Sequence, residues 1–177
     1  MKKNIVLIGM PGVGKSTIGV VLAKNLGYHF LDSDLLIQEE TEKLLQQLID
    51  DYGIDRFLAI EDDINASICV EKTVIATGGS AIFGQEAMKH FQKTGIIIYL
   101  QLSYESINER LGDLKKRGVT LRENQTLLDL YYERKPYYEK YANILIDCEK
   151  KSIREIVCEI ATEVMKITEK SVNDETD

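Results

Sequence analysis

The chain has no tryptophan, and only two prolines and three cysteines occur among its 177 residues. Cys69, Cys148 and Cys158 stand far apart in the sequence, so they form no CxxC zinc motif and indicate no disulfide framework. Such cysteines usually pack as small apolar side chains, and they fit a reducing compartment. No apolar run approaches the ~20 residues that a membrane-spanning helix needs, and Ile5–Ile8 is too short for a signal peptide. We therefore expect a cytoplasmic protein with no membrane partner.

Positive charge is also in short supply. Lysine and arginine total 22 against 29 aspartates and glutamates, which gives a formal net charge of −7. Because like charges repel, we do not expect nucleic acid as a partner. Hydrophobic residues make up 44% of the chain, enough to bury the core of one domain over residues 1–177. An anionic ligand would therefore need a local binding device.

Short β-branched runs alternate with helical patterns along the chain. Apolar residues recur at helical spacing across 18–26 and 153–164, and Ser152 with Glu155 fits a capping box before the second helix. The alternation predicts βαβ units and a mostly parallel sheet covered by helices on both faces. Residues 170–177 are polar and are expected to form a frayed tail. The runs that we predict as strands are Ile5–Ile8, Phe30-Leu31, Val74–Ala76, Ile96–Leu100 and Ile144–Ile146.

The first predicted strand leads directly into a phosphate-binding motif. Residues 9–16 read Gly-Met-Pro-Gly-Val-Gly-Lys-Ser, which is GxxxxGK[ST] between a strand and a helix. The glycines let backbone N–H groups point inward, and the helix that begins near Lys15 adds its positive N-terminal end. Lys15 would reach the β- and γ-phosphates, and the Ser16 hydroxyl would bind Mg²⁺. The motif predicts a nucleoside triphosphate site.

Two carboxylates follow the second predicted strand. Asp32 and Asp34 face the same side because strand residues alternate, and ligands of open α/β sheets bind at this end of the strands. One carboxylate could hold the metal, and the other could accept a proton from an attacking hydroxyl. The alternative is that Asp34 only caps the helix that follows.

Four segments, taken together, resemble the shikimate kinase family of nucleoside-monophosphate-kinase-like P-loop proteins. The resemblance runs from about Asn4 to Ile160. It implies a three-layer α/β/α sandwich around a five-stranded parallel sheet. It also implies Mg²⁺ and ATP as cofactors and phosphorylation of the 3-hydroxyl of shikimate, a step of aromatic amino-acid biosynthesis. The four segments are Gly9–Thr17, Asp32-Ser33-Asp34, Thr77-Gly78-Gly79 and Arg134-Lys135-Pro136-Tyr137-Tyr138.

The resemblance implies roles for residues on the nucleotide side. Lys15 would hold the transferring phosphate, and Ser16 with Asp32 would hold the magnesium. Arg117 would be the lid arginine that closes over the phosphates, in a lid at 111–124. That window is locally basic, with four basic residues against two acidic ones from Asp113 to Asn124, as such a lid requires. The further nucleotide-binding residues would be Gly12, Val13, Gly14, Thr17 and, against the adenine, Arg110.

The acceptor side is implied in the same way. Asp34 would bind the acceptor hydroxyls and assist deprotonation, and Gly78 and Gly79 would offer backbone contacts. Arg134 would pair with the acceptor carboxylate. Residues 35–61 would form the acceptor-binding segment. The ring of Pro136 disfavours a regular helix across Arg134, which would turn that side chain into the cleft.

Three positions depart from the family pattern. Leu58 stands where the family has an arginine that binds the acceptor carboxylate, although Gly53, Phe57 and Glu61 match in register. Ser80 replaces the third glycine of a Gly-Gly-Gly run. In the lid, the usual Arg-Pro-Leu-Leu is replaced by Arg117-Gly118-Val119-Thr120-Leu121.

These departures leave three functions open. The chain is a shikimate kinase, a kinase of another small hydroxylated metabolite, or a nucleotide-binding regulator without catalysis. Intact Lys15, Asp34 and Arg117 argue against the regulator. Arg56 would point away from position 58 on a helix, and whether Arg56 or Arg122 replaces the missing arginine stays open. We expect a monomer.

Overall fold

The computed structural model describes residues 4–111, 122 and 124–173, with side chains as far as residue 169. Arg117 and most of the predicted lid therefore lie outside the described residues. The described strands form one parallel five-stranded sheet in the order β2-β3-β1-β4-β5. The fold class that the alternating pattern predicts is confirmed. The strands are Asn4–Ile8 (β1), His29–Asp32 (β2), Thr73–Ala76 (β3), Gly95–Gln101 (β4) and Ile144–Asp147 (β5).

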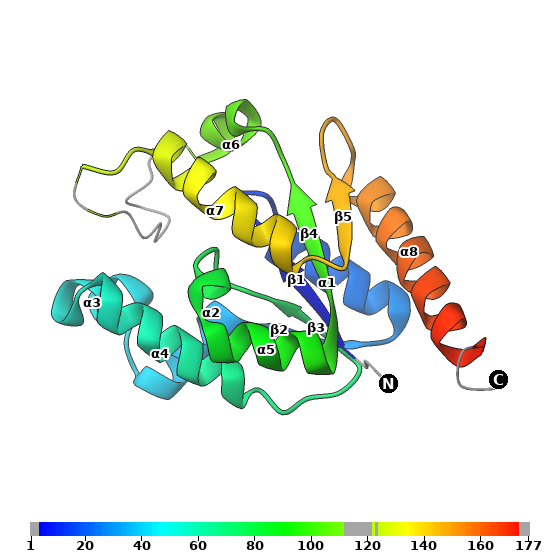
Figure 1. Ribbon diagram of the computed structural model, residues 1–177, viewed down its shortest axis with the longest axis horizontal. Coiled ribbons are helices and arrows are strands. Elements are labelled where there is room, and N and C mark those ends of the chain that lie inside the picture. Colours follow the sequence, from blue (N-terminus) through cyan, green and yellow to red (C-terminus); the bar gives the residue numbers. More distant parts are fainter. Residues whose placement is uncertain (1–3, 112–121, 123, 174–177) are drawn as a thin grey trace.

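Helices cover both faces of the sheet (Figure 1). Helices α1 (Lys15–Leu26) and α8 (Ile153–Asn173) pack together on one face, and α5 (Gln85–Thr94) and α7 (Leu127–Tyr141) lie on the other. The central strand β1 is buried at every residue because it has neighbours on both edges and helices on both faces. Helix α6 (Tyr104–Leu111) follows β4. None of the helices in the described ranges is both long and apolar enough to cross a bilayer.

Three helices form a separate unit beside this sandwich. They are α2 (Ser33–Thr41), α3 (Leu45–Tyr52) and α4 (Ile54–Ser67), and they fall largely within the predicted acceptor-binding segment at 35–61. The unit has its own small apolar core, distinct from the main one. Helix α4 packs on α5 and on the short 3₁₀ turn η1 (Ala81–Phe83), which attaches the unit to the sheet. Its buried core residues are Ile37, Leu48, Phe57 and Ile64.

Of the sequence predictions for the second half of the chain, some are confirmed and others are wrong. The capping box is confirmed, since the Ser152 hydroxyl donates to Glu155 Oε2 at 2.6 Å and accepts from the Glu155 N–H. Helix α8 continues to Asn173, past the start of the expected tail. The prediction for Pro136 was wrong, because α7 runs through it. A helix of fifteen residues packed on the sheet tolerates the single hydrogen bond that the proline removes. Cys148 is buried as expected, whereas Cys69 and Cys158 are exposed.

The three helices α2, α3 and α4 are called the acceptor unit below, after their predicted role. Asp62 gives a test of how this unit is attached to the rest of the protein. Its carboxylate on α4 accepts hydrogen bonds from the N–H groups of Ala87 (2.7 Å) and Glu86 (3.4 Å), and so caps α5 from a distant helix. We expect Asp62→Ala to lower the free energy of unfolding by about 1 kcal/mol, the usual value of an N-cap. Urea unfolding monitored by circular dichroism measures this.

The control is Asp63→Ala, which removes an exposed carboxylate one position further along the same helix. We expect that variant to unfold close to the wild-type midpoint. Equal midpoints for the two variants would show that the cap contributes nothing to stability.

Candidate active site

The P-loop motif folds as a phosphate cradle at the carboxyl end of β1. Gly12 and Gly14 have positive φ angles of 82° and 107°, which side chains with a Cβ rarely adopt. Lys15 is only 8% exposed, and its Nζ donates to the carbonyl oxygens of Gly9 (2.8 Å) and Met10 (3.0 Å). Burial lowers the pKa of Lys15 to about 8, although the neighbouring carboxylates oppose the shift. The ammonium therefore lies at the base of the cradle, poorly solvated and ready to bind an anion.

One cleft of about 410 Å³ joins the cradle to the groups expected to bind the acceptor. Its walls include the P-loop from Pro11 to Thr17, Asp34 on α2, and Thr77 and Gly79 after β3. The strands are parallel, so their carboxyl ends, and the residues that follow them, meet at one edge of the sheet. The P-loop and the residues predicted to bind the acceptor, Asp34 and Gly79, thus line a single cavity.

Two oxygen ligands for a cation meet at the mouth of the cradle. The Ser16 hydroxyl donates to Asp32 Oδ2 at 2.6 Å, and Asp32 Oδ1 accepts from the Asp34 N–H at 3.0 Å. No cluster of three or more histidine, cysteine, aspartate or glutamate side chains occurs in the part of the chain that is described. This sparse oxygen set fits Mg²⁺, which keeps waters and phosphate oxygens as its remaining ligands.

Asp34 faces the cleft from the first turn of α2. The helix is capped by Asp32, so the alternative that Asp34 serves only as the cap is wrong. Burial, together with the nearby Asp32, raises the pKa of Asp34 to about 6, while Lys15 opposes the shift. A carboxylate with this pKa is ionised at neutral pH and is basic enough to take a proton from a hydroxyl group.

Glu61 is an acidic residue buried beside Gly78, and the sequence pattern left its role unassigned. It is 1% exposed, and no hydrogen bond from the described residues reaches either carboxylate oxygen. Burial raises the pKa of Glu61 to about 7; Asp34 adds to the shift, and Ser80, Arg134 and Lys15 oppose it. The register of Gly53, Phe57 and Glu61 was the signal available in the sequence.

Arg134 reaches the same site from α7. The Arg134 side chain is 2% exposed. It points toward the site without the break in the helix that Pro136 was expected to cause, because α7 is continuous there. A Cβ on Gly79 would lie 2.8 Å from Arg134 Nη1 and 2.8 Å from Pro11 Cδ, so only glycine fits between them. The Tyr138 hydroxyl donates to the Gly79 carbonyl at 2.7 Å and fixes this floor. Gly78 is confined in the same way, because its missing Cβ would contact Glu61 and Asp34.

The other predicted site residues fall in different places. Arg110 Nη1 donates to the Val13 carbonyl at 3.3 Å, which places the guanidinium beside the P-loop. Arg117 lies outside the described residues, so its role stays a prediction. Leu58 packs against the small core of the acceptor unit, and Ser80 is buried beside Glu61.

Comparisons with known proteins agree with this geometry. The family profile described as shikimate kinase matches residues 11–165. The shikimate kinase of Thermodesulfovibrio yellowstonii is 36% identical over 169 residues, which cover 94% of this chain and 97% of the relative.

Solved structures of shikimate kinases also share the fold of this chain. A shikimate kinase from Acinetobacter baumannii in complex with shikimate superposes with a TM-score of 0.84 at 30% identity, over 94% of each chain. The shikimate kinase of Aquifex aeolicus gives a TM-score of 0.80 at 28% identity, over 93% of this chain and 98% of the other. A gluconokinase from Sinorhizobium meliloti, at 21% identity and a TM-score of 0.64, shares the fold alone.

The buried carboxyl of Glu61 should make stability depend on pH. Its pKa is raised from 4.5 to about 7, so the folded protein keeps a proton that the unfolded chain releases. The free energy of unfolding then falls as pH rises through this window, on the order of 2 kcal/mol between pH 5 and pH 8. We expect Glu61→Gln to remove most of that slope. Urea unfolding at a series of pH values measures it.

The matched control is Glu39→Gln, on the exposed side of α2, which should keep the wild-type slope. A Glu61→Gln protein with the same pH dependence as the wild type would contradict the assignment.

Proposed function

We propose that this chain, which belongs to the shikimate kinase family, transfers the γ-phosphoryl group of ATP to the 3-hydroxyl of shikimate. The products are shikimate 3-phosphate and ADP. The single observation that carries the proposal is the shared cleft, in which the phosphate cradle and the acceptor-side groups Asp34 and Gly79 line one cavity. A phosphoryl donor and a hydroxyl acceptor bound there lie next to each other, as direct transfer requires.

On the donor side, the backbone N–H groups of the P-loop and the Lys15 ammonium bind the β- and γ-phosphates. Ser16 and Asp32 would hold Mg²⁺, which neutralises charge on the phosphates as the bond to the leaving oxygen breaks. Arg110 lies beside the P-loop, in a position to flank the adenine. Arg117 is proposed as the lid arginine that closes over the phosphates.

On the acceptor side, Asp34 accepts a hydrogen bond from the 3-hydroxyl and takes its proton as the oxygen attacks phosphorus. Arg134 binds the shikimate carboxylate, because a guanidinium matches the two oxygens of that group. Gly78 and Gly79 would contact the acceptor through their backbone, and the absence of side chains there lets Asp34 and Arg134 approach the same place. The acceptor unit of α2, α3 and α4 supplies Asp34 to the cleft and places Glu61 behind it, beside Gly78.

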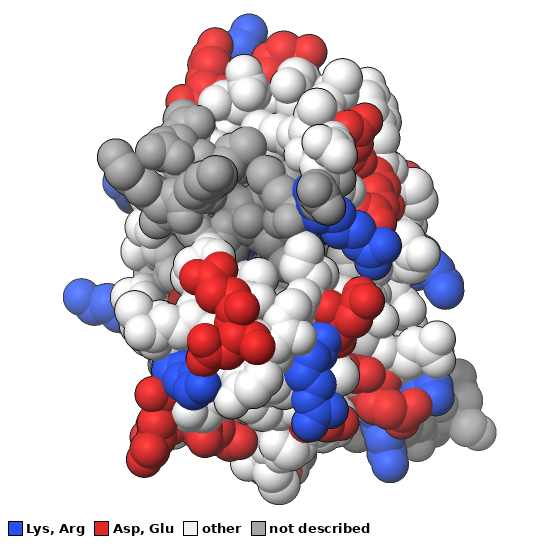
Figure 2. Space-filling model, turned by 90° about the vertical axis from the view of Figure 1, so that its left-hand side faces the viewer, with Lys and Arg blue, Asp and Glu red and all other residues white. Residues whose placement is uncertain are grey.

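We also propose that the protein acts as a cytoplasmic monomer. Every group assigned to donor or acceptor comes from one chain, so the cleft needs no second copy. Figure 2 shows acidic and basic side chains interspersed on the face that it presents, rather than a continuous basic surface suited to nucleic acid. Sedimentation of the purified protein at micromolar concentration tests the monomer.

The function is tested by measuring ADP release with a panel of small hydroxylated metabolites that includes shikimate. We expect saturable turnover with shikimate and a higher kcat/KM than with any other member of the panel. A higher kcat/KM with a different acceptor would show that Leu58 and Ser80 have redirected the pocket. Calorimetry with Mg·ATP or Mg·ADP tests the nucleotide site by itself.

Asp34 gives a second test. Removing a general base typically lowers the rate by about 10² to 10⁴, so we expect Asp34→Asn to reduce kcat in that range while the KM for ATP stays near wild type. The exposed Asp63→Asn should leave kcat unchanged. A nearly active Asp34→Asn enzyme would exclude Asp34 as the base.

A further inference from the structure

The acceptor pocket lacks one guanidinium that the family pattern contains. Leu58 occupies the position of that arginine and lines a small recess of about 20 Å³. Arg134 borders the same recess, with its Cζ 5.7 Å from the centre of the Phe83 ring. An acceptor carboxylate bound by Arg134 on this side would find no cation at position 58.

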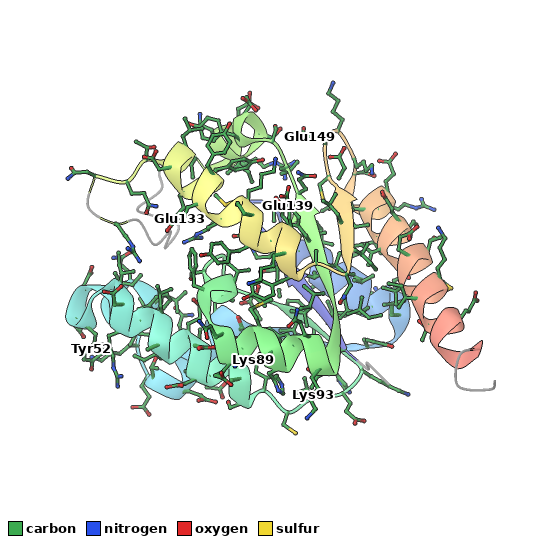
Figure 3. All side chains as sticks on the ribbon, viewed as in Figure 1. Tyr52, Lys89, Lys93, Glu133, Glu139 and Glu149 are labelled. Atoms are coloured by element: carbon green, nitrogen blue, oxygen red, sulfur yellow. The ribbon has the colours of Figure 1, made fainter. Side chains whose placement is uncertain are left out.

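Arg122 is a second arginine on this recess. A short turn holds it there: the Arg122 N–H donates to Gln125 Oε1 at 3.1 Å, and the Gln125 N–H donates to the Arg122 carbonyl at 3.0 Å. Gln125 Nε2 in turn donates to Glu133 Oε2 at 2.6 Å. Glu133, labelled in Figure 3, precedes Arg134 on α7, so the turn that carries Arg122 is attached beside Arg134.

The Arg122 guanidinium is only weakly engaged in this arrangement. Its Nη2 lies 3.9 Å from Asp55 Oδ1, and the Arg122 and Asp55 side chains are 63% and 96% exposed. An exposed ion pair at that distance holds a side chain loosely. Glu133 is the one carboxylate that lines the recess among the described residues, and Gln125 already donates to it. Arg122 and Arg134 are the two cations that line the recess among the described residues, and both could face an anionic group bound there.

Arg56 is not in a position to serve instead. It lines a different groove, about 350 Å³ in volume, together with Lys43 and Tyr52. Tyr52 lies on the side of the acceptor unit away from Glu133 in Figure 3. Positions 56 and 58 are two residues apart on α4 and point to different sides of the helix. Arg122 therefore lies at the recess that Leu58 lines, whereas Arg56 lies at a different groove.

We propose that Arg122 supplies the second guanidinium for the acceptor carboxylate, together with Arg134, in place of the arginine that Leu58 replaces. The inference rests on the proposed function, since it assigns a specificity-determining residue for the same acceptor. Arg122 comes from the segment before α7, whereas position 58 lies on α4. The carboxylate would be bound between elements that are far apart in the chain.

The test compares Arg122→Ala with wild type, using shikimate and an analogue in which a hydroxymethyl group replaces the carboxylate. Loss of a charge-assisted contact should raise the KM for shikimate about tenfold or more, while the KM for ATP and kcat change little. With the analogue, the two enzymes should have the same KM. Arg56→Ala is the matched control and should behave as wild type with both acceptors.

A second variant tests the shared recess. In the Arg122→Ala background, Leu58→Arg places a guanidinium at the same recess and should restore much of the lost affinity for shikimate. An Arg122→Ala enzyme whose KM for shikimate stays within about twofold of wild type would overturn the inference. So would an equal loss with the carboxylate-free analogue.

The wild-type measurement separates the two proposals. If the wild type turns over shikimate and Arg122→Ala is unaffected, the inference fails and the proposed function stands. If the wild type does not turn over shikimate, the proposed function fails, and the assignment of Arg122 fails with it.

Discussion

Four ionisable side chains from different elements lie close enough together, in a poorly solvated region, to influence one another's charge: Lys15, Asp34, Glu61 and Arg134. Each is costly to bury alone, and each is made tolerable by opposite charges nearby. The balance is incomplete, because burial still lowers the pKa of Lys15 and raises those of Asp34 and Glu61. A bound polyphosphate would add negative charge next to Lys15, and the carboxylate of a hydroxylated acid would add negative charge next to Arg134.

The backbone does as much as the side chains in forming this site. The cradle is made of N–H groups that glycines allow to point inward, and the acceptor floor is made of Gly78 and Gly79. A side chain at Gly79 would occupy the space between Arg134 and Pro11. The close approach of α7 to the P-loop therefore depends on the absence of a single Cβ, and the Tyr138 hydroxyl holds the carbonyl that remains.

Two of the three departures from the family pattern, Leu58 and Ser80, fall on the predicted acceptor side of the site. Leu58 lies three residues before Glu61 on the same helix and brings no positive charge to that side of it. Burial raises the pKa of the Glu61 carboxyl, while the Ser80 hydroxyl beside it opposes the shift. The residues predicted to bind phosphate and metal, Lys15, Ser16 and Asp32, match the family pattern.

Short-range patterns were sufficient for much of this protein. The apolar runs predicted all five strands, and the P-loop motif predicted Lys15 at the base of a cradle. Asp34 lines the cleft as expected, although it lies on helix α2 and not on the strand whose alternation was the reason for that prediction. Each of these depends on residues that are neighbours in the chain. The sequence pattern left Glu61 without a role and did not choose between Arg56 and Arg122, and it misjudged the effect of Pro136. Whether a residue is buried, and which cavity it faces, depends on contacts with segments that are distant in the sequence. Only the tertiary structure brings those segments together.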